Sequence, residues 1–175
     1  MPGTYFGSEY LDNTLDYSAT VDLKLEEWEE ETIFAFDAFI RNIDRRTRKP
    51  NLFFKDRTVH LIDHELSLHL DGKTFDELFE EREKHWKFMN LEDPELRREH
   101  LFLAKLKERN KKNPVTFDTF REYLRTLDVD LLDEYATQLE SNGNDSSDLA
   151  FIKPYIESVK LNPDKFIQIL QELVA

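Results

Sequence analysis

Apolar side chains recur at helical spacing over most of the chain. The first such stretch runs from Leu23 to Arg41, and Asp22 is a suitable N-cap in front of it. The apolar residues that set its period, and that we expect to be buried, are Trp28, Phe36, Phe39 and Ile40. The pattern predicts one long helix over residues 23–41.

Residues 42–70 follow, and their pattern is not helical. They contain Pro50, then Asn-Leu-Phe-Phe at 51–54, a polar Lys-Asp-Arg turn, and the β-prone run at 58–62. Two short β-prone runs around a polar turn predict a β-hairpin.

Helix signals return from Thr74 onward. Thr74 and Glu77 match a capping box, and Asp93-Pro94 and Asn162-Pro163 each place proline at a first helical position. Further helices are expected from Thr116, from Asp128 or Asp130, and over Leu149 to Val159, the last bent or interrupted at Pro154. We expect residues 141–147 to form a loop, and four to six helices in all after the hairpin.

These elements predict a mainly α fold with a small β-hairpin. The chain has 175 residues, which suits one domain. Glycine is scarce, with 4 residues, and this argues against a β-sandwich with its many turns. The expected organisation is an N-terminal segment, 1–22, followed by a helical body, 23–175, with the non-helical insert 42–70.

Composition and charge exclude several function classes. Asp and Glu number 37 against 24 Lys and Arg, a net charge of −13, so nucleic acid and anionic membranes are not expected partners. Cysteine is absent, which excludes disulfides, thiolate zinc sites and cysteine nucleophiles. No apolar run approaches the roughly 18 residues of a membrane helix, and no signal-peptide pattern is present. A soluble, cytoplasmic protein is expected.

Basic residues gather in two stretches of this acidic chain. Residues 41–57 and residues 97–112 each hold seven Lys or Arg and two Asp or Glu. The second stretch alternates with leucines at helical spacing and is expected to be a solvated helix face. The first lies in the irregular insert, where positive charge favours an anionic phosphate.

Three polar residues of the insert follow the order that phosphoryl transfer requires. Kinases place a catalytic Asp and a metal-binding Asn in a loop after a helix, and a metal-binding Asp after a hairpin. Asp44, Asn51 and Asp63 have this order, and Arg45 would fix the loop electrostatically. Each also has a simpler interpretation on its own: Asp44 as a helix-end cap paired with Arg45 or Arg46, and Asp63 as a turn residue.

The residues around these positions resemble the core of the HipA-like kinase family. The segments that carry the resemblance are Phe-Asp-Ala-Phe at 36–39, Asn-Ile-Asp-Arg at 42–45, Asn-Leu at 51–52 and Leu-Ile-Asp-His at 61–64. Upstream, Phe-Gly-Ser-Glu-Tyr-Leu at 6–11 resembles the segment that links the two lobes. The resemblance covers about residues 4–70.

The resemblance implies a fold, an activity and a set of site residues. Residues 1–22 would be the interlobe segment, and residues 23–175 a protein-kinase-like C-terminal lobe (α+β). The implied activity is Mg²⁺-dependent transfer of the γ-phosphoryl group of ATP to a protein Ser or Thr. Asp44 would be the catalytic base with Arg45 as its structural partner, and Asn51 and Asp63 would hold the metal.

Several features depart from the kinase pattern. Asn51 follows Asp44 at seven positions instead of the five of protein kinases, and Glu65 stands where a glycine is typical. Neither a Gly-rich phosphate loop nor a strand lysine precedes the interlobe segment. We therefore expect the ATP-covering lobe to come from a separate chain or a homo-oligomer, from a part of the protein outside this sequence, or from an unusually short N-terminus. The expected substrate is a protein. The alternative is an inactive pseudokinase or protein-interaction module.

The histidines offer a competing metal site. His60, His64 and His69 lie near Asp63 and Glu65 in the sequence. The simpler interpretation makes His64 a packed, hydrogen-bonded residue beside Asp63. His85 and His100 are expected on amphipathic helices, in surface or core-edge positions.

Overall fold

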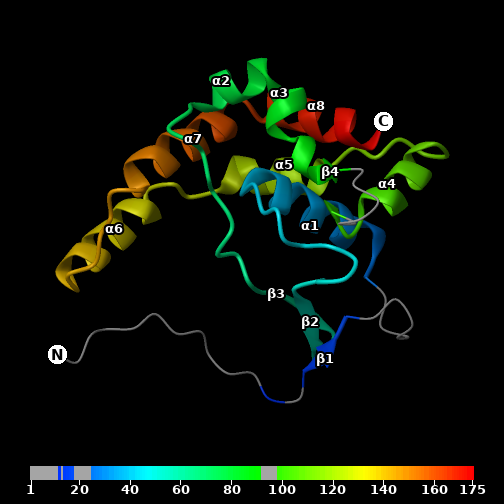
Figure 1. Ribbon diagram of the computed structural model, residues 1–175, viewed down its shortest axis with the longest axis horizontal. Coiled ribbons are helices and arrows are strands. Elements are labelled where there is room, and N and C mark those ends of the chain that lie inside the picture. The colour runs from blue at the N-terminus through cyan, green and yellow to red at the C-terminus, as the bar shows by residue number, and fades with distance from the viewer. Residues whose placement is uncertain (1–11, 13, 18–24, 92–97) are drawn as a thin grey trace.

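The computed structural model describes residues 12, 14–17, 25–91 and 98–175. Within them the α-helices are α1 (Glu27–Phe39), α2 (Phe75–Glu80), α3 (Arg82–His85), α4 (Leu103–Asn110), α5 (Asp118–Thr126), α6 (Leu131–Ser141), α7 (Leu149–Leu161) and α8 (Pro163–Val174). A 3₁₀ helix, η1, covers Lys87–Met89, and the strands are β1 (Leu15–Asp16), β2 (Leu52–Lys55), β3 (Thr58–Leu61), β4 (Asn90–Leu91) and β5 (Arg98–Glu99). The helices gather around α1, with the β1-β2-β3 sheet at one side and α6 extending outward beside α7 (Figure 1). The prediction of a mainly α fold with a small hairpin is confirmed.

Helix α1 is shorter than predicted at both ends. Its N-cap is Glu26, whose backbone N–H donates to Oε2 of Glu29 at 2.7 Å, whereas Asp22 lies outside the described residues. The helix stops after Phe39, because Arg41 adopts a left-handed backbone conformation with φ of 55° that redirects the chain. Trp28, in the first turn, is half exposed and not part of the core.

The hairpin lies where the sequence pattern places it. Strands β2 and β3 pair antiparallel, with Leu52 opposite Leu61 and Lys55 opposite Thr58. The two turn residues, Asp56 and Arg57, have φ of 50° and 67°, as a two-residue hairpin turn of type I′ requires. Strand β1 adds to the free edge of β2, and the sequence did not predict it because two residues carry no periodic signal.

The capping box at Thr74 is formed. Oγ1 of Thr74 accepts the backbone N–H of Glu77 at 3.3 Å, and Oε2 of Glu77 accepts that of Thr74 at 2.8 Å. The helix that follows is broken near Glu81 into α2 and α3. For this reason seven α-helices follow the hairpin in the described residues, more than the four to six expected. Asp93-Pro94 lies outside the described residues.

The C-terminal helices follow their start signals. Helix α5 begins just after Thr116, α6 begins after Asp130, and α8 begins at Pro163. Helix α7 runs through Pro154 without interruption and extends to Leu161, beyond its predicted end at Val159. Among the described helices, none is long and apolar enough to cross a lipid bilayer.

The basic stretch around α4 is only partly a solvated face. Leu103 and Leu106 are fully buried, while Lys111 and Lys112 are exposed. Arg109 instead reaches α1 and pairs with two of its glutamates, Glu30 at 2.7 Å and Glu31 at 2.9 Å. A buried carboxylate needs a partner of this kind, and Glu30 is 2% exposed.

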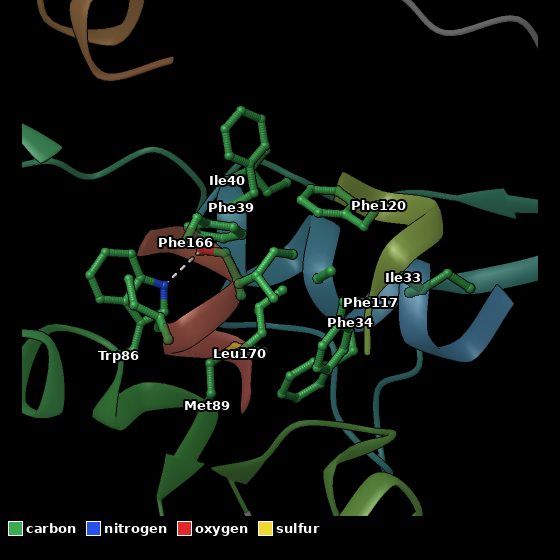
Figure 2. Packing of buried hydrophobic residues seen from close by; sticks show 14 of the residues in the cluster. Ile33, Phe34, Phe39, Ile40, Trp86, Met89, Phe117, Phe120, Phe166 and Leu170 are labelled. Atoms are coloured by element: carbon green, nitrogen blue, oxygen red, sulfur yellow. Dashed lines mark hydrogen bonds between the residues drawn. The ribbon is translucent and has the colours of Figure 1, made fainter. Parts of the chain in front are cut away.

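The core is built around the C-terminal half of α1 (Figure 2). Phe39 packs against aromatic rings of α5, α7 and α8 at centroid distances of 5.9–6.1 Å. The last carbonyl groups of a helix lack partners within the helix. Here the indole N–H of Trp86 donates to the carbonyl of Ala38 at 2.9 Å, and the hydroxyl of Tyr155 donates to that of Phe39 at 2.7 Å. These contacts fix the point where the chain leaves α1 and enters the insert.

Candidate functional site

The insert is anchored by a buried polar cluster, which we call the Asp37 cluster and which comprises Asp37, Asn42, Arg45 and His100. The Asp37 carboxylate accepts Nε of Arg45 at 2.6 Å and Nδ2 of Asn42 at 2.9 Å, and Nε2 of His100 lies 2.9 Å away. All four residues are at most 4% exposed. Burial acts to raise the pKa of Asp37, but the hydrogen bonds and charges of His100 and Arg45 outweigh it and hold the pKa below its ordinary value.

Arg45 connects this cluster to both ends of the hairpin. Its guanidinium donates to the backbone carbonyls of Pro50, at 3.1 Å, and of Asn51. Nη2 of Arg45 lies 3.0 Å from Nε2 of His64. Arginine is always a donor, so this histidine nitrogen is the acceptor. Burial and the charge of Arg45 lower the pKa of His64, in agreement with a neutral ring.

Asp44, Asn51 and Asp63 are brought together, and we call these three residues the candidate site. Nδ2 of Asn51 lies 3.2 Å from Oδ2 of Asp44. The Nζ of Lys49 lies 2.5 Å from Oδ2 of Asp44 and 2.7 Å from Oδ2 of Asp63. The two carboxylates therefore share one cation, and their side chains retain 12% and 28% of their surface in contact with solvent.

The hairpin holds Asn51 and Asp63 next to each other. Because Leu52 pairs with Leu61, the residues just outside the strands also meet, and the N–H of Ile62 donates to the carbonyl of Asn51 at 3.0 Å. Asn51 and Asp63 both have left-handed backbones, with φ of 49° and 60°. Asn and Asp tolerate this conformation better than other residues with a Cβ, and such strain is common at functional sites.

Asp44 is held separately, by the Asp37 cluster. Its backbone N–H donates to Oδ1 of Asn42 at 3.0 Å, and Nδ2 of Asn42 is bound to Asp37. The carbonyl of Arg45, the next residue, accepts the N–H of Leu101 at 3.1 Å. These hydrogen bonds fix the backbone of the loop at Asp44 and Arg45. The Asp44 carboxylate remains in contact with Lys49 and Asn51.

The donor set of the candidate site fits a divalent cation. Two carboxylates and an amide supply the oxygen ligands that Mg²⁺ takes, and the ammonium of Lys49 shows that one cation can contact both carboxylates. Hydrogen bonds to Asp44 and Asp63 raise the pKa of Lys49, so the cation is permanent at neutral pH. Within the described ranges no three His, Asp or Glu side chains converge on a metal position, so the histidine alternative is not formed.

Three residues of the region were not assigned a role from the sequence. His100 was expected on a helix near the surface, but it is buried in a β-bridge with Arg46 and bonds to Asp37. No local pattern signals a contact between residues 63 positions apart. Asp37 did carry a signal, since it lies on the apolar face of α1. For Lys49 the sequence carried no signal of a specific contact, apart from its position in the basic stretch 41–57.

The sequence matches a known protein family over more than half of its length. The model of a family described as HipA-like kinase matches residues 1–118, more than half of the chain and well beyond the resemblance at residues 4–70. No curated protein and no solved structure matches the chain. The matched segment contains the candidate site and every member of the Asp37 cluster, although the interlobe-like residues 6–11 lie outside the described residues. The chain belongs to the HipA-like kinase family.

Proposed function

We propose that this chain is the catalytic lobe of a kinase that transfers the γ-phosphoryl group of ATP to a Ser or Thr hydroxyl of a protein, with Mg²⁺ as cofactor. One observation carries the proposal: the side chains of Asp44, Asn51 and Asp63 come together. One ammonium group bridges the two carboxylates, and the Asn51 amide contacts the carboxylate of Asp44. Membership of a kinase-like family supports the class of reaction.

Each residue of the candidate site has a role in this reaction. Asp44 orients the attacking hydroxyl and accepts its proton as the new O–P bond forms and the bond to the ADP oxygen breaks. Asp63, together with the amide oxygen of Asn51, would hold the metal. When bound, the metal neutralises charge on the phosphate oxygens.

Arg45 acts through the loop and does not contact the substrate. It is 1% exposed and its donors are directed to Asp37, to two backbone carbonyls and to His64. Arg46 likewise donates to the carbonyl of Ile43 at 2.6 and 2.9 Å. Arg48 is exposed and makes no side-chain hydrogen bond or ion pair with the described residues, so its charge can favour an anionic phosphate. A further lobe would cover the nucleotide, supplied by another part of the same protein, by a separate chain or by a second copy.

The test combines phosphoryl transfer with ligand-dependent stability. Asp44→Ala and Asp63→Ala should both abolish transfer while circular dichroism shows an intact fold. Binding to the native state raises thermal stability, so Mg²⁺ with ATP should stabilise the wild-type chain, and this shift should require Asp63. The exposed turn residue Asp56 offers a matched control, because Asp56→Asn removes a carboxylate of the same hairpin without touching the site. Full activity in both alanine variants would remove the assignment.

A protein-interaction module is the second candidate, and one surface feature favours it. An apolar groove of about 340 Å³ lies between α1, β3 and α5, with Phe36, Leu61 and the half-exposed Tyr123 in its walls. If this is the function, millimolar Mg²⁺ with ATP leaves the melting temperature unchanged and the chain self-associates with concentration. Tyr123→Ser would then reduce that association.

A further inference from the structure

We propose that Lys49 is an internal counter-ion, which occupies the metal position in the metal-free protein and is exchanged for the divalent cation when it binds. The inference rests on the proposed function, because it assumes a metal at the candidate site. It assigns a role to a residue that neither the family resemblance nor the order of Asp44, Asn51 and Asp63 singles out.

The geometry places Lys49 in competition with a metal. Its ammonium contacts one carboxylate oxygen, Oδ2, of both Asp44 and Asp63, at 2.5 and 2.7 Å. The Asp44 oxygen also accepts Nδ2 of Asn51 at 3.2 Å. A metal held by Asn51 and Asp63 therefore needs two changes: Asp63 must release Lys49, and the Asn51 amide must present its oxygen.

The loop is built so that the side chain of Lys49 can leave without its backbone. Lys49 and Arg46 exchange two backbone hydrogen bonds of 3.0 Å each, which fix the main chain at this point. The Lys49 side chain is 54% exposed, and Asp44 and Asp63 are its acceptors in the described structure. A lysine on a flexible four-carbon stem can turn into solvent by rotamer changes alone.

Charge repulsion explains why Lys49 occupies the site without metal and leaves it when the metal binds. Two carboxylates that share a site repel each other when neither has a counter-ion, so Lys49 stabilises the metal-free arrangement. An ammonium and a divalent cation on the same carboxylate repel each other in turn. Lys49 therefore keeps the site assembled without metal and weakens metal binding by competing for Asp63.

The experiment measures the affinity for Mn²⁺ alone, with free Mn²⁺ followed by electron paramagnetic resonance on the full chain. Lys49→Met removes the charge, keeps the length of the side chain and adds no hard ligand. The expected result is a Kd for Mn²⁺ lower by about threefold or more, since losing the competing ion pairs shifts the equilibrium toward metal. Lys49→Arg keeps the cation and should leave the Kd near that of wild type.

Lys153→Met is the matched control. Lys153 on α7 pairs with Asp133 of α6 at 2.6 Å, so this variant removes the same charge and a similar ion pair away from the site. Its Kd should equal that of wild type. Thermal unfolding in the presence of a chelator adds a second readout: Lys49→Met should melt at a lower temperature without metal and gain more than wild type when Mn²⁺ is added.

The outcomes separate this inference from the proposed function. Equal or weaker Mn²⁺ binding by Lys49→Met, beside clear Asp63-dependent binding by wild type, would overturn the exchange and leave the metal site standing. If Asp63→Asn binds Mn²⁺ as tightly as wild type, or if neither wild type nor Lys49→Met binds it, the metal site itself fails and the exchange fails with it.

Discussion

Asp37 is a charged residue in the apolar interior, and its surroundings explain how the insert is positioned. Three donors surround its carboxylate, from Asn42, Arg45 and His100. Arg45, held by Asp37, donates to the backbone carbonyls of Pro50 and Asn51. Asn42, also held by Asp37, accepts the backbone N–H of Asp44. One buried carboxylate thus orients both sides of the candidate site.

Removing the charge of the Asp37 carboxylate should destabilise the folded chain. Asp37→Asn should lower the free energy of unfolding by roughly 3–5 kcal/mol, because it leaves Arg45 buried without its ionic partner. Urea denaturation of wild type and variant measures the difference. Asp71→Asn, on an exposed loop, is the control and should cost little. A loss below roughly 1 kcal/mol for Asp37→Asn would contradict the role given to the cluster.

The same residue predicts a pH dependence. The folded-state pKa of Asp37 lies below its value in the unfolded chain, so its contribution is fully present above the unfolded-state pKa and disappears as pH falls through the folded-state pKa. The stability difference between wild type and Asp37→Asn should therefore be large at about pH 7 and shrink below about pH 4. Urea unfolding across this range checks it, and a difference that grows on acidification would show that the sign is wrong.

At the scale of elements, the hairpin sets the spacing of Asn51 and Asp63. Its register and its turn follow from local sequence: two β-prone runs separated by a short polar segment. The left-handed conformation at Asp56 and Arg57 is imposed by the two-residue turn and is costly for a residue with a Cβ. Glycine at the second turn position would remove that cost.

Arg57→Gly should therefore raise the free energy of unfolding by roughly 0.5–1 kcal/mol, since relief of strain exceeds the added entropy of the unfolded chain. Phosphoryl transfer should be unchanged, because Arg57 is exposed and distant from the candidate site along the hairpin. Gly143→Ala is the opposite control: φ is 74° there, so the substitution should destabilise by about 1 kcal/mol. A lower melting temperature for Arg57→Gly would refute this interpretation of the turn.

Local signals predicted the elements better than their ends. The capping box at Thr74 and the proline at 163 identified true helix starts, because each depends on residues within one turn. The predicted helix over residues 23–41 was longer than α1. The apolar pattern continues beyond both ends of α1, but the hydrogen bond between Glu26 and Glu29 sets its start and the left-handed backbone of Arg41 sets its end. The break between α2 and α3 depends on packing across the molecule, which a helical period does not encode.

At the scale of the whole molecule, contacts between distant segments complete the site. The order of Asp44, Asn51 and Asp63 was readable in the sequence because the hairpin between them is local. His100 was not, because its contact with Asp37 requires the chain to return from α1 through three further helical segments. Long-range partners of this kind carry no periodic signal, and only the folded structure reveals them.

The C-terminal helices also support the site, through the end of α1. Tyr155 of α7 is fully buried and donates its hydroxyl to the carbonyl of Phe39 at 2.7 Å. Tyr155→Phe keeps the ring but leaves that buried carbonyl without its donor, and should cost roughly 1–3 kcal/mol. The midpoint of urea unfolding measures this, with the exposed Tyr135→Phe of α6 as control. Equal midpoints for both variants would show that α7 does not stabilise this end of α1.

The central claim is that Asn51 and Asp63 bind a divalent metal beside Asp44, and the most direct test is anomalous diffraction from a crystal soaked in Mn²⁺. We predict a peak within roughly 2.3 Å of a carboxylate oxygen of Asp63 and of the amide oxygen of Asn51. The Lys49 side chain should be turned away from Asp63 in that crystal. A soaked crystal with Mn²⁺ bound elsewhere and none between these residues, or with an unchanged peak in Asp63→Asn, would contradict the account.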